Sequence, residues 1–159
     1  MKSLQQAFAA ITDSCQPLTL LSCGGSASVI ASHWAEHHPD SLLTELDHRM
    51  ALNAFPLSQT HDLALVCDTL EHLSHNDGQL LLGQLRNFGT HQIAVAVSEN
   101  AHWRFQDFIG LGFSRQGPVC DGDTECLLYT YNIDSYNHRR SWNNPDHWAN
   151  PDMWGKAWW

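Results

Sequence analysis

The stretch LTLLSCGGSASVIASHW, residues 18–34, decides the fold class of this chain. An apolar run of strand length, 18–23, meets two adjacent glycines, and helical spacing then resumes over 26–38. Pro39 ends the helical pattern, since a proline cannot continue a helix. A buried strand, a glycine turn and a helix in this order are typical of α/β folds that hold a ligand where the strand ends.

The same alternation continues along the chain. Apolar runs predict further strands at 41–47, 61–68 and 91–98. Amphipathic spacing predicts helices at 1–17, 74–89 and 101–112. The predicted buried faces are Ala27, Val29, Ile30 and Trp34 on helix 26–38, and Leu81, Leu82, Leu85 and Phe88 on helix 74–89. Residues 113–119 and 125–133, joined by the turn-rich CDGDT, predict a β-hairpin.

These elements predict an α/β three-layer sandwich. Its sheet is expected to be mostly parallel and to end in the antiparallel hairpin, because parallel strands need crossover connections that place helices on both faces. Residues 1–132 would form this domain, with 1–17 as its N-terminal helix. The segment 48–60 is too short for a crossover helix followed by another strand, so one connection is expected to be contracted.

Composition and charge exclude several classes of partner. The chain has 159 residues, 43% of them hydrophobic, and a formal net charge of −9. This acidic balance argues against direct binding to nucleic acid or to an anionic membrane. The five cysteines are odd in number and two of them end apolar runs, which favours free thiols in a reducing compartment. No apolar stretch has the length of a signal or membrane segment, so we expect a cytoplasmic protein.

The C-terminal segment, residues 133–159, differs from the rest of the chain. Trp142, Trp148 and Trp154 recur every six residues, separated by Asn-Pro-Asp or related turn sequences. Three interpretations remain open: the indoles cover part of the sheet, they line a ligand site, or they join two chains. Basic residues in this segment are matched by acidic ones, which argues against base stacking. We expect a tryptophan-rich extension that packs on the domain or on a partner chain, including a second copy.

The order of these motifs resembles a known family. LLSCGGSAS, LDHRMALNAFPLSQTHDLALVCDTLEHLS, LLLGQLRNFGTHQIAVAVSE, FQDFIGLGFSRQG and CLLYTYNI are similar to successive blocks of the Rossmann-like, class I S-adenosylmethionine-dependent methyltransferases. The resemblance runs from about residue 18 to residue 132. It implies a methyltransferase-like sheet, S-adenosylmethionine as cofactor, and a small-molecule or protein group as methyl acceptor.

The resemblance also implies a set of cofactor-binding residues. In that family the glycine loop receives the methionine part of the cofactor, an acid after the second strand binds the ribose, and later segments flank the adenine. The corresponding positions in this chain are Cys23, Gly24, Gly25, Ser26, Asp47, Asn53, Ala54, Asp68 and Leu70. Glycine lets the backbone approach a ligand, and a carboxylate accepts both ribose hydroxyls.

Three features depart from the family pattern. Leu20 stands where the family has an acid on the first strand, the loop has only two adjacent glycines with serines where further glycines are expected, and segment 48–60 is contracted. They favour an alternative function: a non-catalytic binding or scaffolding protein that has kept the fold and lost the cofactor.

No residue can be named as catalytic from the pattern alone. Methyl transfer is an in-line displacement that depends mainly on positioning, so it needs no strong base. The adjacent Glu71 and His72 are expected to point apart and to have structural or solvent-exposed roles, not acid–base roles. Of the eleven histidines, His33 with His37 and His72 with His75 lie close in sequence, but neither pair is completed to a metal-ligand set. We therefore expect no metal site.

Overall fold

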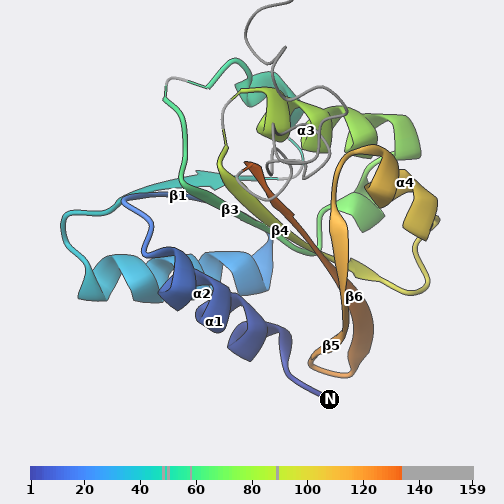
Figure 1. Ribbon diagram of the computed structural model, residues 1–159, viewed down its shortest axis with the longest axis horizontal. Coiled ribbons are helices and arrows are strands. Elements are labelled where there is room, and N and C mark those ends of the chain that lie inside the picture. The colour runs from blue at the N-terminus through green and yellow to red at the C-terminus, as the bar shows by residue number, and fades with distance from the viewer. Residues whose placement is uncertain (48, 50, 58, 89, 134–159) are drawn as a thin grey trace, which may run out of the picture.

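The described residues form a three-layer α/β sandwich around one six-stranded sheet (Figure 1). The computed structural model describes residues 1–47, 49, 51–57, 59–88 and 90–133. The strand order is β2-β1-β3-β4-β6-β5. The strands are β1 (Thr19–Cys23), β2 (Leu42–Leu46), β3 (Leu63–Val66), β4 (Gln92–Ser98), β5 (Ser114–Asp121) and β6 (Thr124–Asn132). β1 to β4 are parallel to one another, whereas β6 pairs antiparallel with both β4 and β5. The predicted fold class is confirmed.

Helices cover both faces of the sheet. In Figure 1, α1 (Leu4–Cys15) and α2 (Gly25–His37) lie on one side, and α3 (His75–Asn87) and α4 (Phe105–Gly110) lie on the other. Each face has its own buried cluster: Phe8 and Trp34 belong to the first, and Phe108 stacks on Tyr129 at 3.8 Å in the second. Burial of these apolar faces is the main stabilising contribution to such a sandwich.

Helix starts follow the capping chemistry of the sequence. Ser3 and Gln6 form a capping box at α1, and the hydroxyl of Ser74 accepts a hydrogen bond from the backbone N–H of Asp77 at α3. Helix α4 is shorter than the predicted 101–112, because residues 101–104 form the loop that leads into it.

The prediction of burial is wrong for two residues, Val29 and Phe88. Val29 is 55% exposed, and the buried face of α2 is instead Ala27, Ala31 and Trp34, which lie four and three positions apart. Phe88 is 43% exposed because it follows the end of α3 and no longer shares its inner face.

The connection from β2 to β3 is contracted, as predicted. Its described residues form one short 3-10 helix, η1 (Ala51–Ala54), before β3 begins. In the described sheet, β2 is therefore an edge strand, and Leu42 is 56% exposed. A second 3-10 helix, η2 (Leu70–His72), precedes α3.

The predicted extension, with Trp142, Trp148 and Trp154, lies outside the described residues from position 134 onward. Among the residues that are described, no helix combines the length and the apolar character required to cross a membrane.

Candidate functional site at the carboxyl ends of the strands

Three neighbouring parallel strands end at one edge of the sheet. Cys23, the last residue of β1, is in register with Leu46 of β2 and with Val66 of β3. The next residues, Gly24 and Asp47, therefore follow adjacent strands at the same edge. In open α/β sheets, this carboxyl edge is where ligands bind.

The two glycines of the turn have different roles. Gly24 has φ +105°, and a Cβ there would overlap the carbonyl oxygen of Cys67. Its lack of a side chain is required by packing within the chain. A Cβ on Gly25, the first residue of α2, would have no atom within 4 Å. Gly25 thus leaves open space at the first residue of a 13-residue helix, where helix polarity favours a carboxylate; within the same turn, the Ala27 N–H donates to the Cys67 thiol.

A network of hydrogen bonds ties the ends of β1 and β3 together. The Cys67 N–H donates to the Cys23 carbonyl at 2.9 Å, and the Thr69 hydroxyl donates to the Cys67 carbonyl at 2.8 Å. The Cys67 thiol accepts from the Ala27 N–H at 3.2 Å. Thr69 is completely buried. The sequence analysis missed Thr69; its only signal is a small hydroxyl residue just after the strand.

Burial keeps both thiols of this network protonated. It raises the pKa of Cys67 to about 12 and also raises the pKa of Cys23. A buried thiol with a raised pKa is not a nucleophile at neutral pH. Cys23 and Cys67 are free and buried, so they stabilise the turn by packing.

Ser26 contacts the hairpin. Its hydroxyl donates to the carboxylate of Asp121 at 2.8 Å, and Asp121 ends β5. The resemblance placed Ser26 in the cofactor loop. The structure places it in the first turn of α2, where its bond to Asp121 joins the turn to the hairpin.

The predicted ribose and adenine residues lie beyond β2. The Asp47 side chain is exposed and accepts a hydrogen bond from the Arg49 N–H at 3.1 Å. Asn53 is exposed and Ala54 is half-buried, both in η1. Asp47 is close enough to Cys23 for its charge to help raise the pKa of that thiol. The structure therefore brings Asp47 to the same edge as the glycine turn.

The two residues predicted after β3 lie in different environments. Asp68 is exposed, has φ +46°, and accepts a hydrogen bond from Nε2 of His72 at 3.1 Å. Leu70 is 2% exposed and belongs to the core cluster beneath α3. Of the pair, Asp68 has the polar group available at the edge.

Two cavities flank Glu71 at this edge. The first, of about 420 Å³, lies between the segment after β3 and the loop after β4, and Trp103 and His75 line it. The second, of about 250 Å³, is lined by Asp68, Asp121 and buried cysteines. Glu71 and Ser98 line both cavities, and the Glu71 carboxylate accepts the Ser98 N–H at 2.7 Å. Glu71 thus has a position between two cavities, which its sequence context did not show.

The cavity of about 420 Å³ contains an oriented histidine. Nε2 of His75 lies 3.0 Å from a carboxylate oxygen of Asp107 at the start of α4. This hydrogen bond lowers the pKa of Asp107, and the hydrogen bond from the Arg104 N–H lowers it further by a smaller amount. The His75 ring also packs 4.8 Å from the ring of Trp103, which lies where a side chain on Gly78 would be.

Of the two histidine pairs noted in the sequence, His33 and His37 lie together, with ring centroids 4.5 Å apart, whereas His72 and His75 have different partners. His72 contacts Asp68, whereas His75 contacts Asp107. Within the described ranges, no group of three or more His, Cys, Asp or Glu side chains is arranged to hold a metal ion.

The fold matches solved methyltransferases. The N-methyltransferase NodS from Bradyrhizobium japonicum, in complex with S-adenosyl-L-homocysteine, is 12% identical, has a TM-score of 0.60, and is matched over 80% of this chain and 84% of its own. A putative O-methyltransferase from Nostoc punctiforme is 15% identical and has a TM-score of 0.58; the match covers 80% of this chain and 55% of that protein. Magnesium protoporphyrin IX methyltransferase from Synechocystis, with bound SAH, is 13% identical and has a TM-score of 0.52; the match covers 80% of this chain and 83% of that protein.

These similarities define a methyltransferase-like α/β fold. The matched part of the chain spans 55% of the length of the Nostoc protein. The chain belongs to DUF6231, described as a family of unknown function, whose match covers residues 2–159. No curated protein matches the chain in sequence.

Proposed function

We propose that the chain binds S-adenosylmethionine across the carboxyl ends of β1, β2 and β3 and transfers its methyl group to a small-molecule or protein acceptor. One observation carries the proposal: the register of three parallel strands brings Gly25, Asp47 and Asp68 to one edge. The solved neighbours include proteins described with bound SAM or SAH.

The residues at this edge fit most parts of the cofactor. The open space at Gly25, at the positive end of the α2 dipole, suits the methionine carboxylate, and the exposed carboxylate of Asp47 suits the ribose hydroxyls. Asn53 is exposed beyond Asp47, where an adenine would lie. One family contact is missing, because Leu20 is 1% exposed within the core and has no polar group.

When bound, S-adenosylmethionine supplies a methyl group attached to a sulfonium sulfur, and after transfer of that methyl group the sulfur is left as a neutral thioether. The chain's task is then to hold the acceptor in line with that methyl group and to exclude water. The cavity of about 420 Å³ beside Glu71 would hold the acceptor, with Trp103 as an aromatic wall.

His75 would receive the acceptor's proton. Because Asp107 holds Nε2, the ring nitrogen left outside that contact is Nδ1. An imidazole oriented by a carboxylate is a suitable proton acceptor for a hydroxyl or amine that is being methylated.

Calorimetric titration with S-adenosylhomocysteine tests cofactor binding. We expect the unaltered protein to bind and Asp47→Asn to bind about 10-fold or more weakly, because one charge-assisted acceptor is lost. Asp40→Asn, which changes an exposed carboxylate before β2 at the opposite edge of the sheet, is the matched control and should bind normally.

Absence of both heat and thermal stabilisation at millimolar ligand would refute the proposal. That result would leave the non-catalytic binding or scaffolding function suggested by the departures at Leu20 and 48–60. If the ligand binds, incubation with methyl-labelled S-adenosylmethionine and fractionated cell extract identifies whether the label enters small molecules or protein.

A further inference from the structure

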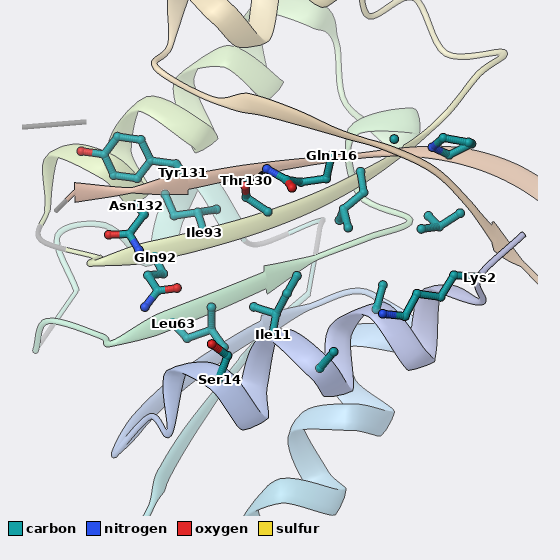
Figure 2. Close-up of a pocket in the computed structure, with 16 residues that line it drawn as sticks. Lys2, Ile11, Ser14, Leu63, Gln92, Ile93, Gln116, Thr130, Tyr131 and Asn132 are labelled. Atoms are coloured by element: carbon teal, nitrogen blue, oxygen red, sulfur yellow. Dashed lines mark hydrogen bonds between the residues drawn. The ribbon is translucent and has the colours of Figure 1, made fainter. Parts of the chain in front are cut away.

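A groove of about 530 Å³ lies on the α1 side of the sheet (Figure 2). Ile11 and Ser14 of α1 line one wall, and Thr130 of β6 lies opposite. It reaches Leu63 and Gln92, the first residues of β3 and β4, so it extends to the sheet edge opposite the candidate cofactor site. The proposed methyl transfer does not use it.

The floor of the groove is apolar and its rim carries amides. Leu63, Val119 and Leu128, which belong to the core cluster on this face, are each between 0% and 6% exposed. Gln92, Gln116 and Asn132 surround them, and Gln116 donates to the Thr130 hydroxyl at 2.8 Å. Among the described residues that line the groove, Lys2 is the one charged side chain.

This lining suits a flat, neutral ring that carries a single hydrogen-bond donor. An indole buries a large apolar area and directs one N–H to an acceptor, such as an amide or hydroxyl oxygen at the rim. An acidic or strongly basic ligand would find no matching cluster of charges among the lining residues that the structure describes.

The chain itself carries such rings in the segment that follows the last groove residue in sequence. Asn132, the last residue of β6, lines it, and the following Ile133 N–H donates to the His91 carbonyl at 2.9 Å. Residues 134–159 continue directly from this point and contain Trp142, Trp148, Trp154, Trp158 and Trp159. Fully extended, a segment of that length spans about 90 Å, so it can reach every part of the groove.

Two further observations favour this segment over a separate partner. Its three basic residues, Arg139, Arg140 and Lys156, are balanced by Asp134, Asp146 and Asp152, so the segment is neutral overall, as the lining requires. The family match includes residues 134–159 together with the domain, so the extension is part of the same family unit.

We propose that tryptophan side chains from residues 134–159 of the same chain fill the groove between α1 and the β5–β6 hairpin. The indole rings would then cover the part of this sheet face that α1 leaves open.

Amide hydrogen exchange on the full chain tests the proposal without any ligand. Three substitutions made together, Trp142→Ala, Trp148→Ala and Trp154→Ala, should speed exchange in α1 and at the end of β6 about 10-fold, while exchange in α3 stays unchanged. Because these residues lie outside the described domain, circular dichroism should still report its helices and strands.

A second variant alters the groove and leaves the extension intact. Ala10 lines the groove and is exposed, so Ala10→Arg should obstruct docking without disturbing the core and should speed exchange at the end of β6 by a similar factor. Gln5→Arg, an exposed position on α1 outside the lining, is the matched control and should behave as the unaltered protein.

Unchanged exchange around the groove in both the tryptophan variant and Ala10→Arg would overturn the proposal. The proposal would also be overturned if protection of these amides from exchange rises with protein concentration and the protein in solution has the mass of a dimer. A second copy of the chain would then be the occupant of the groove.

Discussion

On the β1–β3 side of the candidate cofactor site, backbone packs directly on backbone: Gly24 lies against the Cys67 carbonyl, and Thr69 bonds to the same group. On the β2 side, the strand is an edge of the described sheet, and Asp47 and Asn53 are exposed on a short connection. The first side is determined by contacts within the chain. The second side presents side chains whose contribution depends on a ligand.

This difference changes how the glycine turn should be interpreted. A glycine after the first strand is usually taken as a mark of ligand binding, yet Gly24 is required by the chain's own packing whether or not a ligand binds. The evidence for a ligand therefore rests on Gly25 and on the β2 side. Substitutions on each side should separate folding from binding.

The largest effect is expected at Gly24. Gly24→Ala should destabilise the protein by at least about 3 kcal/mol, because the new Cβ overlaps the Cys67 carbonyl and φ is positive. Chemical denaturation measures the change in the free energy of unfolding. Gly25→Ala is the control and should change it by less than about 1 kcal/mol, since nothing lies within 4 Å. Equal small effects at both positions would mean that the turn is not packed on β3 as described.

A smaller effect is expected at Thr69. Thr69→Val keeps the shape of the side chain but leaves the Cys67 carbonyl without the hydroxyl that donates to it at 2.8 Å. The cost should be about 2 kcal/mol in the free energy of unfolding, because the group is fully buried. Thr69→Ser retains the hydroxyl and should cost less. If serine and valine are equally destabilising, the methyl group and not the hydrogen bond is what matters.

The smallest effect concerns pH and the β2 side. Nε2 of His61 lies 3.0 Å from the hydroxyl of Thr44, and this contact joins β2 to the start of β3. Burial lowers the pKa of His61 below 6.5, so the folded state binds fewer protons than the unfolded state. Its contribution to stability is therefore present above about pH 6.5 and is lost as the pH falls toward the folded pKa.

His61→Leu should reduce the slope of unfolding free energy against pH below 6.5 by up to about 1.4 kcal/mol per pH unit. Denaturation curves between pH 5 and 7 measure that slope, and His102→Leu, at an exposed loop position, is the control. An unchanged slope in His61→Leu would mean that His61 is no less readily protonated in the folded protein than in the unfolded chain.

Much of the architecture could be predicted from the periodicity of the chain. The four parallel strands, the hairpin and the helices follow apolar spacing and capping residues such as Ser74, and these signals are local. Val29 was misplaced because a helix of small and apolar residues has two plausible inner faces, and only the contact with the sheet chooses between them. The short α4 was overestimated because its apolar pattern extends into a loop.

The candidate site was less predictable. Resemblance to a family placed Gly24 and Asp47 on neighbouring strand ends, and the strand register brings both residues to one edge. It did not show that Thr69 ties β1 to β3, that Glu71 lies between two cavities, or that His75 pairs with Asp107. Each of these contacts joins segments that the sequence pattern treats separately.

The sequence by itself determined the order of elements, the layered α/β architecture and the contracted connection after β2, because hydrophobic periodicity and turn chemistry act over a few residues. Only the tertiary structure decided which glycine is structural, which acid pairs with which histidine, and where the sheet leaves a groove beside the start of the tryptophan-rich extension. These depend on distances between residues remote in the chain, which folding sets and local patterns do not record.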